Sequence, residues 1–242
     1  MPEPLLLLHG FMQTGRGWDE VVRHLGGERY RPLAPDIRGH GAAAARRPID
    51  FAACVDDVAR LGGPSFALAG YSQGGRVALH VALAHPRRVT RLVLVSTTAG
   101  IEDAAERARR RAADEELAAW MEGDGRLMTE VADRWGAQPL FGTQPPRVTA
   151  AARADRLSNE PVHVAAALRG IGTGVMAPLW DRLGELDLPV AVLAGERDPA
   201  YVALGERLAR ALPRGELTIV PGAGHALPLE APAAVAAAIE VR

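Results

Sequence analysis

Lysine is absent from this 242-residue chain, and cysteine occurs once, at Cys54. All 28 basic residues are therefore arginines, and the 29 acidic residues bring the formal net charge to −1. A near-neutral balance without a basic tract gives no electrostatic footprint for nucleic acid. A single cysteine excludes an internal disulfide and a metal-binding cysteine cluster, and it favours a reducing compartment such as the cytoplasm.

Long apolar runs are also missing. The run at residues 5–8 is too short for a signal peptide and lacks a positively charged flank, and no apolar segment is long enough to span a bilayer. No cofactor motif is present. The sequence therefore predicts a small-molecule partner rather than nucleic acid or membrane, and it leaves a homo-oligomer open.

The most informative stretch is Phe66-Ala-Leu-Ala-Gly-Tyr-Ser-Gln-Gly-Gly-Arg76. An apolar run that suits one buried strand ends at Gly70, and a helical pattern begins behind Ser72. Gly70, Ser72 and Gly74 fit the G-x-S-x-G nucleophile elbow, in which a sharp strand-to-helix turn presents the serine hydroxyl. Alone, this motif is equally compatible with a helix entry that has a serine near its cap.

Strand and helix patterns alternate along most of the chain, which predicts a parallel sheet covered on both faces. Between about residues 98 and 178 the alternation stops, and only helical patterns occur. We therefore expect an α/β core formed by residues 1–98 and 179–242, with residues 99–178 inserted as a helical cap. The expected strands are residues 5–8, 30–35, 66–70, 89–96, 189–195 and 216–220.

Two further polar residues follow predicted strands. Asp198 comes after the strand that ends near Gly195, and His225 lies in a glycine-rich loop after the strand that ends near Val220. A serine needs a general base, and that base needs an orienting carboxylate. Asp198 alone could be a helix cap and His225 alone a loop histidine, but the order Ser72, Asp198, His225 is that of α/β-hydrolases.

The chain resembles an α/β-hydrolase over its whole length. That resemblance implies an oxyanion hole made by the backbone N–H groups of Gln73, which follows the serine, and Phe11, in the loop after the first strand. The chain begins almost at that strand, so we expect about six parallel strands without the two antiparallel strands that usually open such a sheet.

Within the superfamily the chain most closely resembles the lyases of menaquinone biosynthesis, the 2-succinyl-6-hydroxy-2,4-cyclohexadiene-1-carboxylate synthases. Cap residues carry most of this narrower resemblance, which matters because caps vary freely between α/β-hydrolases. The matching segments are residues 70–76, 98–103, 106–110 with Asp114, 135–141, 156–159, 168–174 and 178–180. The segment 36–41, by contrast, resembles general hydrolases more than this family.

The resemblance implies a lyase that eliminates pyruvate from an enol-pyruvyl cyclohexene carboxylate, with Ser72 activated by His225 as the base. A polyanionic substrate needs fixed cations, and arginine binds carboxylates through two parallel hydrogen bonds. Arg76 lies one helical turn beyond Ser72, and Arg110 and Arg156 match substrate-contacting arginines of the family. Tyr71, Trp135 and Gln138 are further candidates for lining the site, although ordinary packing explains a tryptophan equally well.

Two other functions remain open at this point. A carboxylesterase or carbon–carbon bond hydrolase would use Ser72 as a true nucleophile on a small acidic substrate. A catalytically silent α/β-hydrolase would serve as a receptor or scaffold, and it would require Asp198 or His225 to lie far from Ser72. The charge around Ser72 separates the lyase from the esterase.

Overall fold

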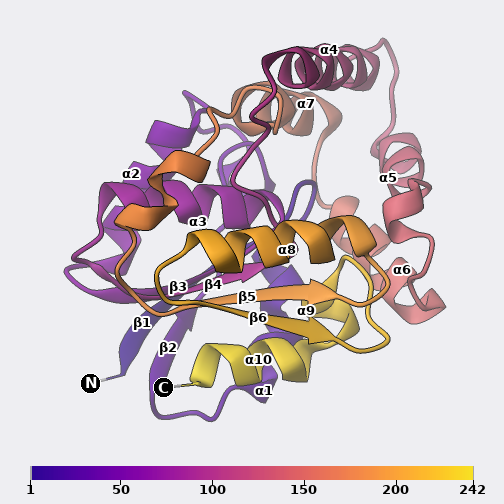
Figure 1. Ribbon diagram of the computed structural model, residues 1–242. Helices are drawn as coiled ribbons and strands as arrows, with labels where there is room; N and C mark the ends of the chain where they lie inside the picture. Colours follow the sequence, from indigo (N-terminus) through magenta and orange to yellow (C-terminus); the bar gives the residue numbers. More distant parts are fainter. Residues whose placement is uncertain (1, 242) are drawn as a thin grey trace.

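A computed structural model describes residues 2–241. Its centre is a sheet of six parallel strands in the order β2-β1-β3-β4-β5-β6, which confirms the parallel α/β architecture expected from the sequence (Figure 1). Strand β3, which precedes Ser72, lies in the interior between β1 and β4. The strands are Glu3–Leu8 (β1), Tyr30–Leu33 (β2), Phe66–Tyr71 (β3), Val89–Val95 (β4), Val190–Gly195 (β5) and Gly215–Val220 (β6).

Both faces of the sheet are buried, which explains the continuous apolar runs of its strands. In β1, Leu6 and Leu8 point into the core under one layer of helices, and Leu5 and Leu7 point into the core on the opposite face. The first layer contains α2 (Phe51–Gly62), α3 (Gln73–Ala84) and α8 (Pro199–Ala211), and the second contains α1 (Asp19–His24) and α10 (Pro232–Glu240).

Four helices separate β4 from β5 in the chain. They form two packed pairs, α4 with α7 and α5 with α6, and Figure 1 shows α5 and α6 on the side toward which the β5 and β6 arrowheads point. The site described below lies at this carboxyl edge of the sheet. The helices are Ala104–Met121 (α4), Met128–Gly136 (α5), Pro146–Arg156 (α6) and Pro161–Ile171 (α7).

Several element boundaries differ from those expected. Strand β2 ends at Leu33 and not at Pro35, and it accommodates Pro32 because it lies at the edge of the sheet. Helix α8 begins at Pro199, since the Asp198 side chain accepts from the Tyr201 N–H and caps it. The short helix α9 (Leu227–Glu230), directly after His225, was not expected from the sequence.

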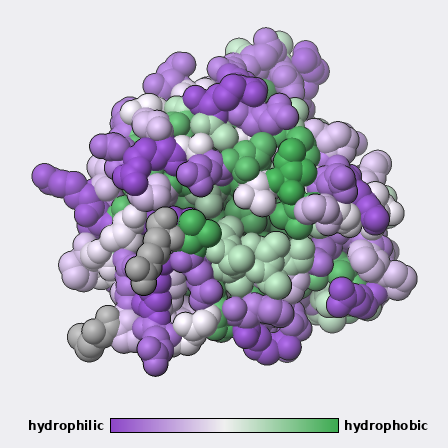
Figure 2. Space-filling view, turned by 60° about the horizontal axis from the view of Figure 1, so that its bottom comes forward, coloured by the Kyte–Doolittle hydropathy of each residue, from purple (hydrophilic) through white to green (hydrophobic). Residues whose placement is uncertain are grey.

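Figure 2 shows apolar side chains gathered in a patch surrounded by hydrophilic ones, on a face seen from below the view of Figure 1. Helix α10 lies on this side of the molecule, and its Ala233 and Ala237 are exposed. Across residues 2–241, every helix is too short or too polar to traverse a bilayer.

Candidate active site

Ser72 stands at the turn between β3 and α3. Its backbone has φ 51° and ψ −109°, a conformation that is rare for a residue with a side chain. Glycines permit the tight approach around it. A Cβ on Gly70 would lie 2.4 Å from the Gly74 carbonyl oxygen, and a Cβ on Gly74 would lie 2.1 Å from the Leu8 carbonyl oxygen. Neither glycine can therefore carry a side chain without moving the main chain.

The structure brings Ser72, His225 and Asp198 together from distant parts of the chain. The His225 Nε2 atom lies 3.3 Å from the Ser72 Oγ, and the His225 Nδ1 atom lies 2.7 Å from the Asp198 Oδ2. Both partners of the serine are buried, with His225 1% and Asp198 5% exposed. In this arrangement the carboxylate accepts from Nδ1–H, which leaves Nε2 free to accept the serine proton.

Aromatic rings enclose the imidazole of His225. The rings of Tyr201, Tyr71 and Phe141 have centroids 4.4, 5.4 and 6.0 Å from that of His225. Tyr201 was not singled out from the sequence, although it follows Asp198 by only three residues in the first turn of α8. Burial raises the pKa of the Tyr201 phenol, so the ring stays neutral beside the imidazole.

Two backbone N–H groups near Ser72 are free to bind a negatively charged oxygen. Within residues 2–241, neither the Phe11 N–H nor the Gln73 N–H donates to a protein acceptor. Gln73 opens α3, whose N-terminus favours negative charge. The Gln73 side chain is buried as well, and neither its amide nitrogen nor its amide oxygen has a partner.

A cavity of about 30 Å³ adjoins Ser72. Of the residues expected at the site, Tyr71, Trp135 and Arg156 line it together with Phe11, Ser72 and His225. Most of the remaining wall comes from the helical segment between β4 and β5. Those residues are Leu140, Phe141 and Ala152.

Arg76 and Arg156 are buried cations that form no ion pair within residues 2–241. Arg76 is 6% exposed and donates to the Ile171 carbonyl oxygen at 3.3 Å, while Arg156 is 4% exposed and lies 4.9 Å over the Phe141 ring. No ion pair found in residues 2–241 includes either side chain, and the Nε atom of each has no hydrogen-bond partner. Burial lowers the pKa of Arg76 to about 10 and also lowers that of Arg156. An anion would relieve this unpaired charge.

Three of the expected substrate-binding residues, Arg76, Arg110 and Gln138, do not line the cavity around Ser72. The Arg110 Nε donates to Asp114 Oδ1 at 2.8 Å, and 42% of the Arg110 side chain is exposed. Its charge is therefore partly neutralised, although it still acts on Arg76 and Tyr201 at a distance. Gln138 lines a separate cavity between α4 and α5, and its side chain donates to the Trp135 carbonyl oxygen at 3.2 Å.

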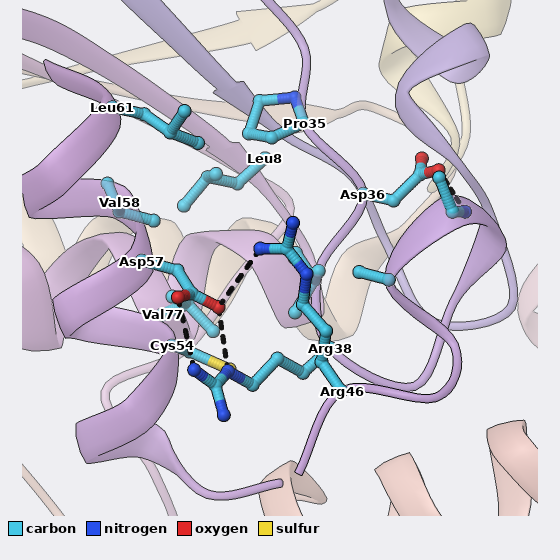
Figure 3. Close-up of a pocket in the computed structure, with 13 residues that line it drawn as sticks. Leu8, Pro35, Asp36, Arg38, Arg46, Cys54, Asp57, Val58, Leu61 and Val77 are labelled. Atoms are coloured by element: carbon cyan, nitrogen blue, oxygen red, sulfur yellow. Dashed lines mark hydrogen bonds and ion pairs between the residues drawn. The ribbon is translucent and has the colours of Figure 1, made fainter. Parts of the chain in front are cut away.

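A second cavity, of about 200 Å³, lies beside α2 and the loop that follows β2 (Figure 3). Its apolar wall includes Leu8, Val58 and Leu61. At its mouth the Arg38 guanidinium binds both carboxylate oxygens of Asp57, at 2.7 and 3.1 Å, as the dashed lines in Figure 3 show. Because these charges satisfy each other and Ser72 does not line it, this cavity is not part of the site.

No group of three or more histidine, cysteine, aspartate or glutamate side chains is placed to hold a metal ion within the described residues. The groups that adjoin Ser72 are the other two triad members, the two free amides and the Arg156 guanidinium.

Comparison with known proteins places this geometry in a family. The sequence matches the alpha/beta hydrolase family over residues 5–238. A protein of Bacillus subtilis (strain 168), provisionally named as a 2-succinyl-6-hydroxy-2,4-cyclohexadiene-1-carboxylate synthase, is 34% identical over 242 residues, covering 95% of this chain and 86% of that protein. The synthase of that name from Enterobacter sp. (strain 638) is 30% identical over 244 residues, covering 97% of this chain and 89% of that protein.

Solved structures agree with the sequence matches. MenH from S. aureus has a TM-score of 0.90 at 29% identity, covering 98% of this chain and 91% of that chain. A thermophilic esterase from Thermogutta terrifontis, with malate bound, has a TM-score of 0.81 at 29% identity, covering 99% of this chain and 88% of that chain. The chain therefore belongs to the alpha/beta hydrolase family, and its whole-length relatives include 2-succinyl-6-hydroxy-2,4-cyclohexadiene-1-carboxylate synthases.

Proposed function

We propose that this protein eliminates pyruvate from an enol-pyruvyl cyclohexene carboxylate, the activity for which its whole-length relatives are named. Its partner would be this small anionic molecule, and the absence of disulfides fits action in the cytoplasm. Residues 99–178 would act as a cap over the core formed by residues 1–98 and 179–242.

In the proposed mechanism Ser72, His225 and Asp198 act as a base. His225 Nε2 takes the Ser72 proton while Asp198 holds Nδ1–H, and the Ser72 oxygen removes a proton from a ring carbon. The electrons of that C–H bond form a ring double bond as the C–O bond to the enol-pyruvyl group breaks. The proton on His225 passes to the leaving oxygen, and the released enol becomes pyruvate. No water is consumed and no acyl-enzyme forms.

The oxyanion hole has a different task here from its task in ester hydrolysis. The Phe11 and Gln73 N–H groups would hold a substrate carboxylate, or the negative charge that develops on it, as the proton leaves the ring. Such preorganised donors stabilise charge that increases in the transition state, and loss of one typically costs about 10²–10³ in rate.

One observation carries the choice of a lyase over a simple esterase. Arg76 and Arg156 are both buried without a carboxylate partner, and Arg156 lines the same cavity as Ser72. A buried guanidinium without a counter-charge is costly, and a substrate with several carboxylates would supply the missing charge. An ester of neutral groups would leave both arginines unpaired.

The second candidate is a carboxylesterase that uses Ser72 as a nucleophile on a small acidic ester. The same triad geometry and the likeness to the Thermogutta terrifontis esterase favour it. The catalytically silent alternative is not favoured, since Asp198 and His225 lie within hydrogen-bonding distance of their partners.

The two reactions can be separated by measuring them side by side. We expect pyruvate release from the enol-pyruvyl substrate to exceed p-nitrophenyl acetate hydrolysis by orders of magnitude in kcat/KM. Arg76→Ala should lower kcat/KM for pyruvate release by about 10²-fold, since a charge-assisted hydrogen bond to a buried anion is worth about 1.5–3 kcal/mol. It should leave ester hydrolysis nearly unchanged.

Arg182→Ala is the matched control, because Arg182 is exposed and pairs only with Glu185. It should leave both reactions unchanged. Equal losses of the two activities in Arg76→Ala would contradict the substrate-binding role, and ester hydrolysis without pyruvate release would favour the esterase.

A further inference from the structure

The loop after β1 takes an unusual path at Met12. Its φ angle of 62° lies in the left-handed region although it is not a glycine, and its side chain is fully buried. Met12 directly follows Phe11, whose N–H belongs to the proposed oxyanion hole. The Met12 carbonyl shares a peptide with the Gln13 N–H, which donates to the Gly10 carbonyl oxygen at 3.1 Å. The Gly10 carbonyl in turn shares a peptide with the Phe11 N–H, so whatever fixes the Met12 carbonyl also helps to fix the direction of the Phe11 amide.

His40 holds one side of this backbone. The Met12 N–H donates to the His40 Nε2 at 3.1 Å, and the His40 Nδ1 lies 3.3 Å from the Arg38 carbonyl oxygen. This pattern assigns the proton to Nδ1 of a neutral ring. Full burial, with His9 nearby, lowers the pKa of His40 to about 3, so the ring stays a hydrogen-bond acceptor at neutral pH.

Asn159 holds the other side, and it comes from the helical segment between β4 and β5. Its Nδ2 donates to the Met12 carbonyl oxygen at 2.9 Å, and its Oδ1 accepts from the Gly41 N–H at 3.0 Å. Asn159 is 7% exposed. One amide therefore ties the loop after β1 to the loop that carries His40.

The same turn carries Arg156. The Asn159 backbone N–H donates to the Arg156 carbonyl oxygen at 3.1 Å, and the Asn159 Nδ2 also reaches that oxygen at 3.3 Å. Arg156 lines the cavity beside Ser72. A single turn after α6 thus supports both a buried cation of the site and the loop that bears the Phe11 N–H.

From this geometry we infer that Asn159 is a positioning residue that sets the oxyanion hole from the helical segment above it. Asn159 donates to the Met12 carbonyl oxygen. This bond keeps the Phe11 N–H directed at the substrate oxygen when the turn after α6 is packed against the core. The inference rests on the proposed function of Ser72 and of the Phe11 amide. It makes the direction of the Phe11 N–H depend on the packing of residues 156–159 against the core.

Asn159→Leu tests this assignment, because leucine fills a similar volume and offers no hydrogen bond. Catalytic groups must be held within about 0.5 Å of their productive positions, so we expect kcat for pyruvate release to fall about 10–100-fold with KM changed less than about 3-fold. Asn159→Asp keeps the acceptor for the Gly41 N–H but loses the donor to Met12, and it should reproduce most of the loss.

Arg153→Ala is the control. Arg153 lies on α6 and forms an ion pair with Asp133 of α5, so its removal disturbs the helical segment without touching the loop after β1. It should leave kcat unchanged. Thermal unfolding of each variant shows whether it is folded at the assay temperature. If Asn159→Leu is unfolded there, the kcat of Asn159→Asp tests the positioning role.

A second readout reports on the hole itself. Phenylboronic acid adds reversibly to a serine oxygen and places a negatively charged oxygen where an oxyanion would sit. Its dissociation constant should rise in Asn159→Leu by about the factor by which kcat falls, and it should not change in Arg153→Ala. A purely structural role for Asn159 would lower the unfolding temperature and leave boronate affinity unchanged.

The outcomes separate this inference from the proposed function. Unchanged kcat and boronate affinity in a folded Asn159 variant, with activity abolished in Ser72→Ala, would overturn the inference and leave the lyase assignment standing. A rise in KM alone would also overturn the inference, because Asn159 would then affect only the position of Arg156 and not that of the Phe11 N–H. Wild-type protein that releases no pyruvate, yet loses boronate affinity on Asn159 substitution, would reject the lyase and keep the positioning role.

Discussion

Backbone strain in this protein gathers at the carboxyl edge of the sheet. Met12, Ser72 and Ser96 are the non-glycine residues with positive φ among residues 2–241, at 62°, 51° and 46°. Each follows one of the strands β1, β3 and β4, which are neighbours in the sheet. Such conformations cost about 1–3 kcal/mol each and persist where surrounding structure holds them. The strain is therefore stored where Ser72 and the two free amides must keep fixed directions.

His40 gives the fold a specific acid sensitivity. Its pKa is about 3 in the folded protein, whereas an unperturbed histidine titrates near about 6.5. Between these values the unfolded chain binds a proton that the folded chain does not, so stability falls as the pH drops from 6.5 toward 3. His9, whose pKa is also lowered by burial, acts in the same direction.

We expect His40→Gln to lose less stability than wild type when the pH is lowered from 7 to 5, by about 2 kcal/mol. Glutamine does not titrate, and its oxygen can accept the Met12 N–H. The measurement is urea unfolding at both pH values, with His24→Gln as the control because His24 is exposed. An identical pH dependence in wild type and His40→Gln would refute this account of His40.

The sequence predicted the triad because each member follows a strand pattern and parallel strands end at one edge. The partners of individual side chains were harder to foresee. The pairing of Arg110 with Asp114 could have been inferred from their i, i+4 spacing on a helix, whereas nothing local shows that Arg76 and Arg156 lack carboxylates. The bonds from Asn159 to Met12 and Gly41 join segments more than a hundred residues apart and required coordinates.

At the scale of elements, the helical segment between β4 and β5 supplies much of the wall beside Ser72. The cavity beside Ser72 measures about 30 Å³, and we expect it to widen when a cyclohexene ring with its side chains binds. Its wall includes Trp135 and Phe141, and the contacts of α5 with α6 include the exposed ion pair of Arg153 with Asp133. Exposed pairs contribute little, so we expect α5 and α6 to move apart more readily than the turn after α6 leaves the core, to which buried Asn159 binds it.

We expect the substrate to order this wall. In Ser72→Ala, which blocks turnover, adding the enol-pyruvyl substrate should slow amide hydrogen exchange across residues 128–159 by about tenfold or more. Helix α1, on the opposite face of the sheet, should exchange at the same rate with and without substrate. Unchanged exchange in residues 128–159 at saturating substrate would contradict an opening of the wall.

The sequence predicted only helices in this segment, and the structure has four α-helices there. Their packing was not predicted, because the pairing of α4 with α7 and α5 with α6 depends on long-range contacts that periodicity does not encode. The four-residue helix α9 was missed because it is too short to show a period.

At the scale of the whole molecule, charge is distributed unevenly. The net charge is only −1, yet Arg76, Arg91 and Arg156 are buried without an ion pair within residues 2–241, and Arg156 lines the cavity beside Ser72. The overall composition does not show which arginines are buried. The fold class followed from strand and helix order, while the substrate class depends on where a few of 28 arginines come to lie.

The most direct test of the central claim is the rate of pyruvate release by purified wild-type protein and by Ser72→Ala, with substrate binding measured in parallel. We expect wild type to release pyruvate and Ser72→Ala to release it at least about 10³-fold more slowly, because removal of a triad serine costs several orders of magnitude. The dissociation constant of the substrate should change little. Equal rates in the two proteins, or no pyruvate from wild type, would contradict the claim that Ser72 is the base of a lyase.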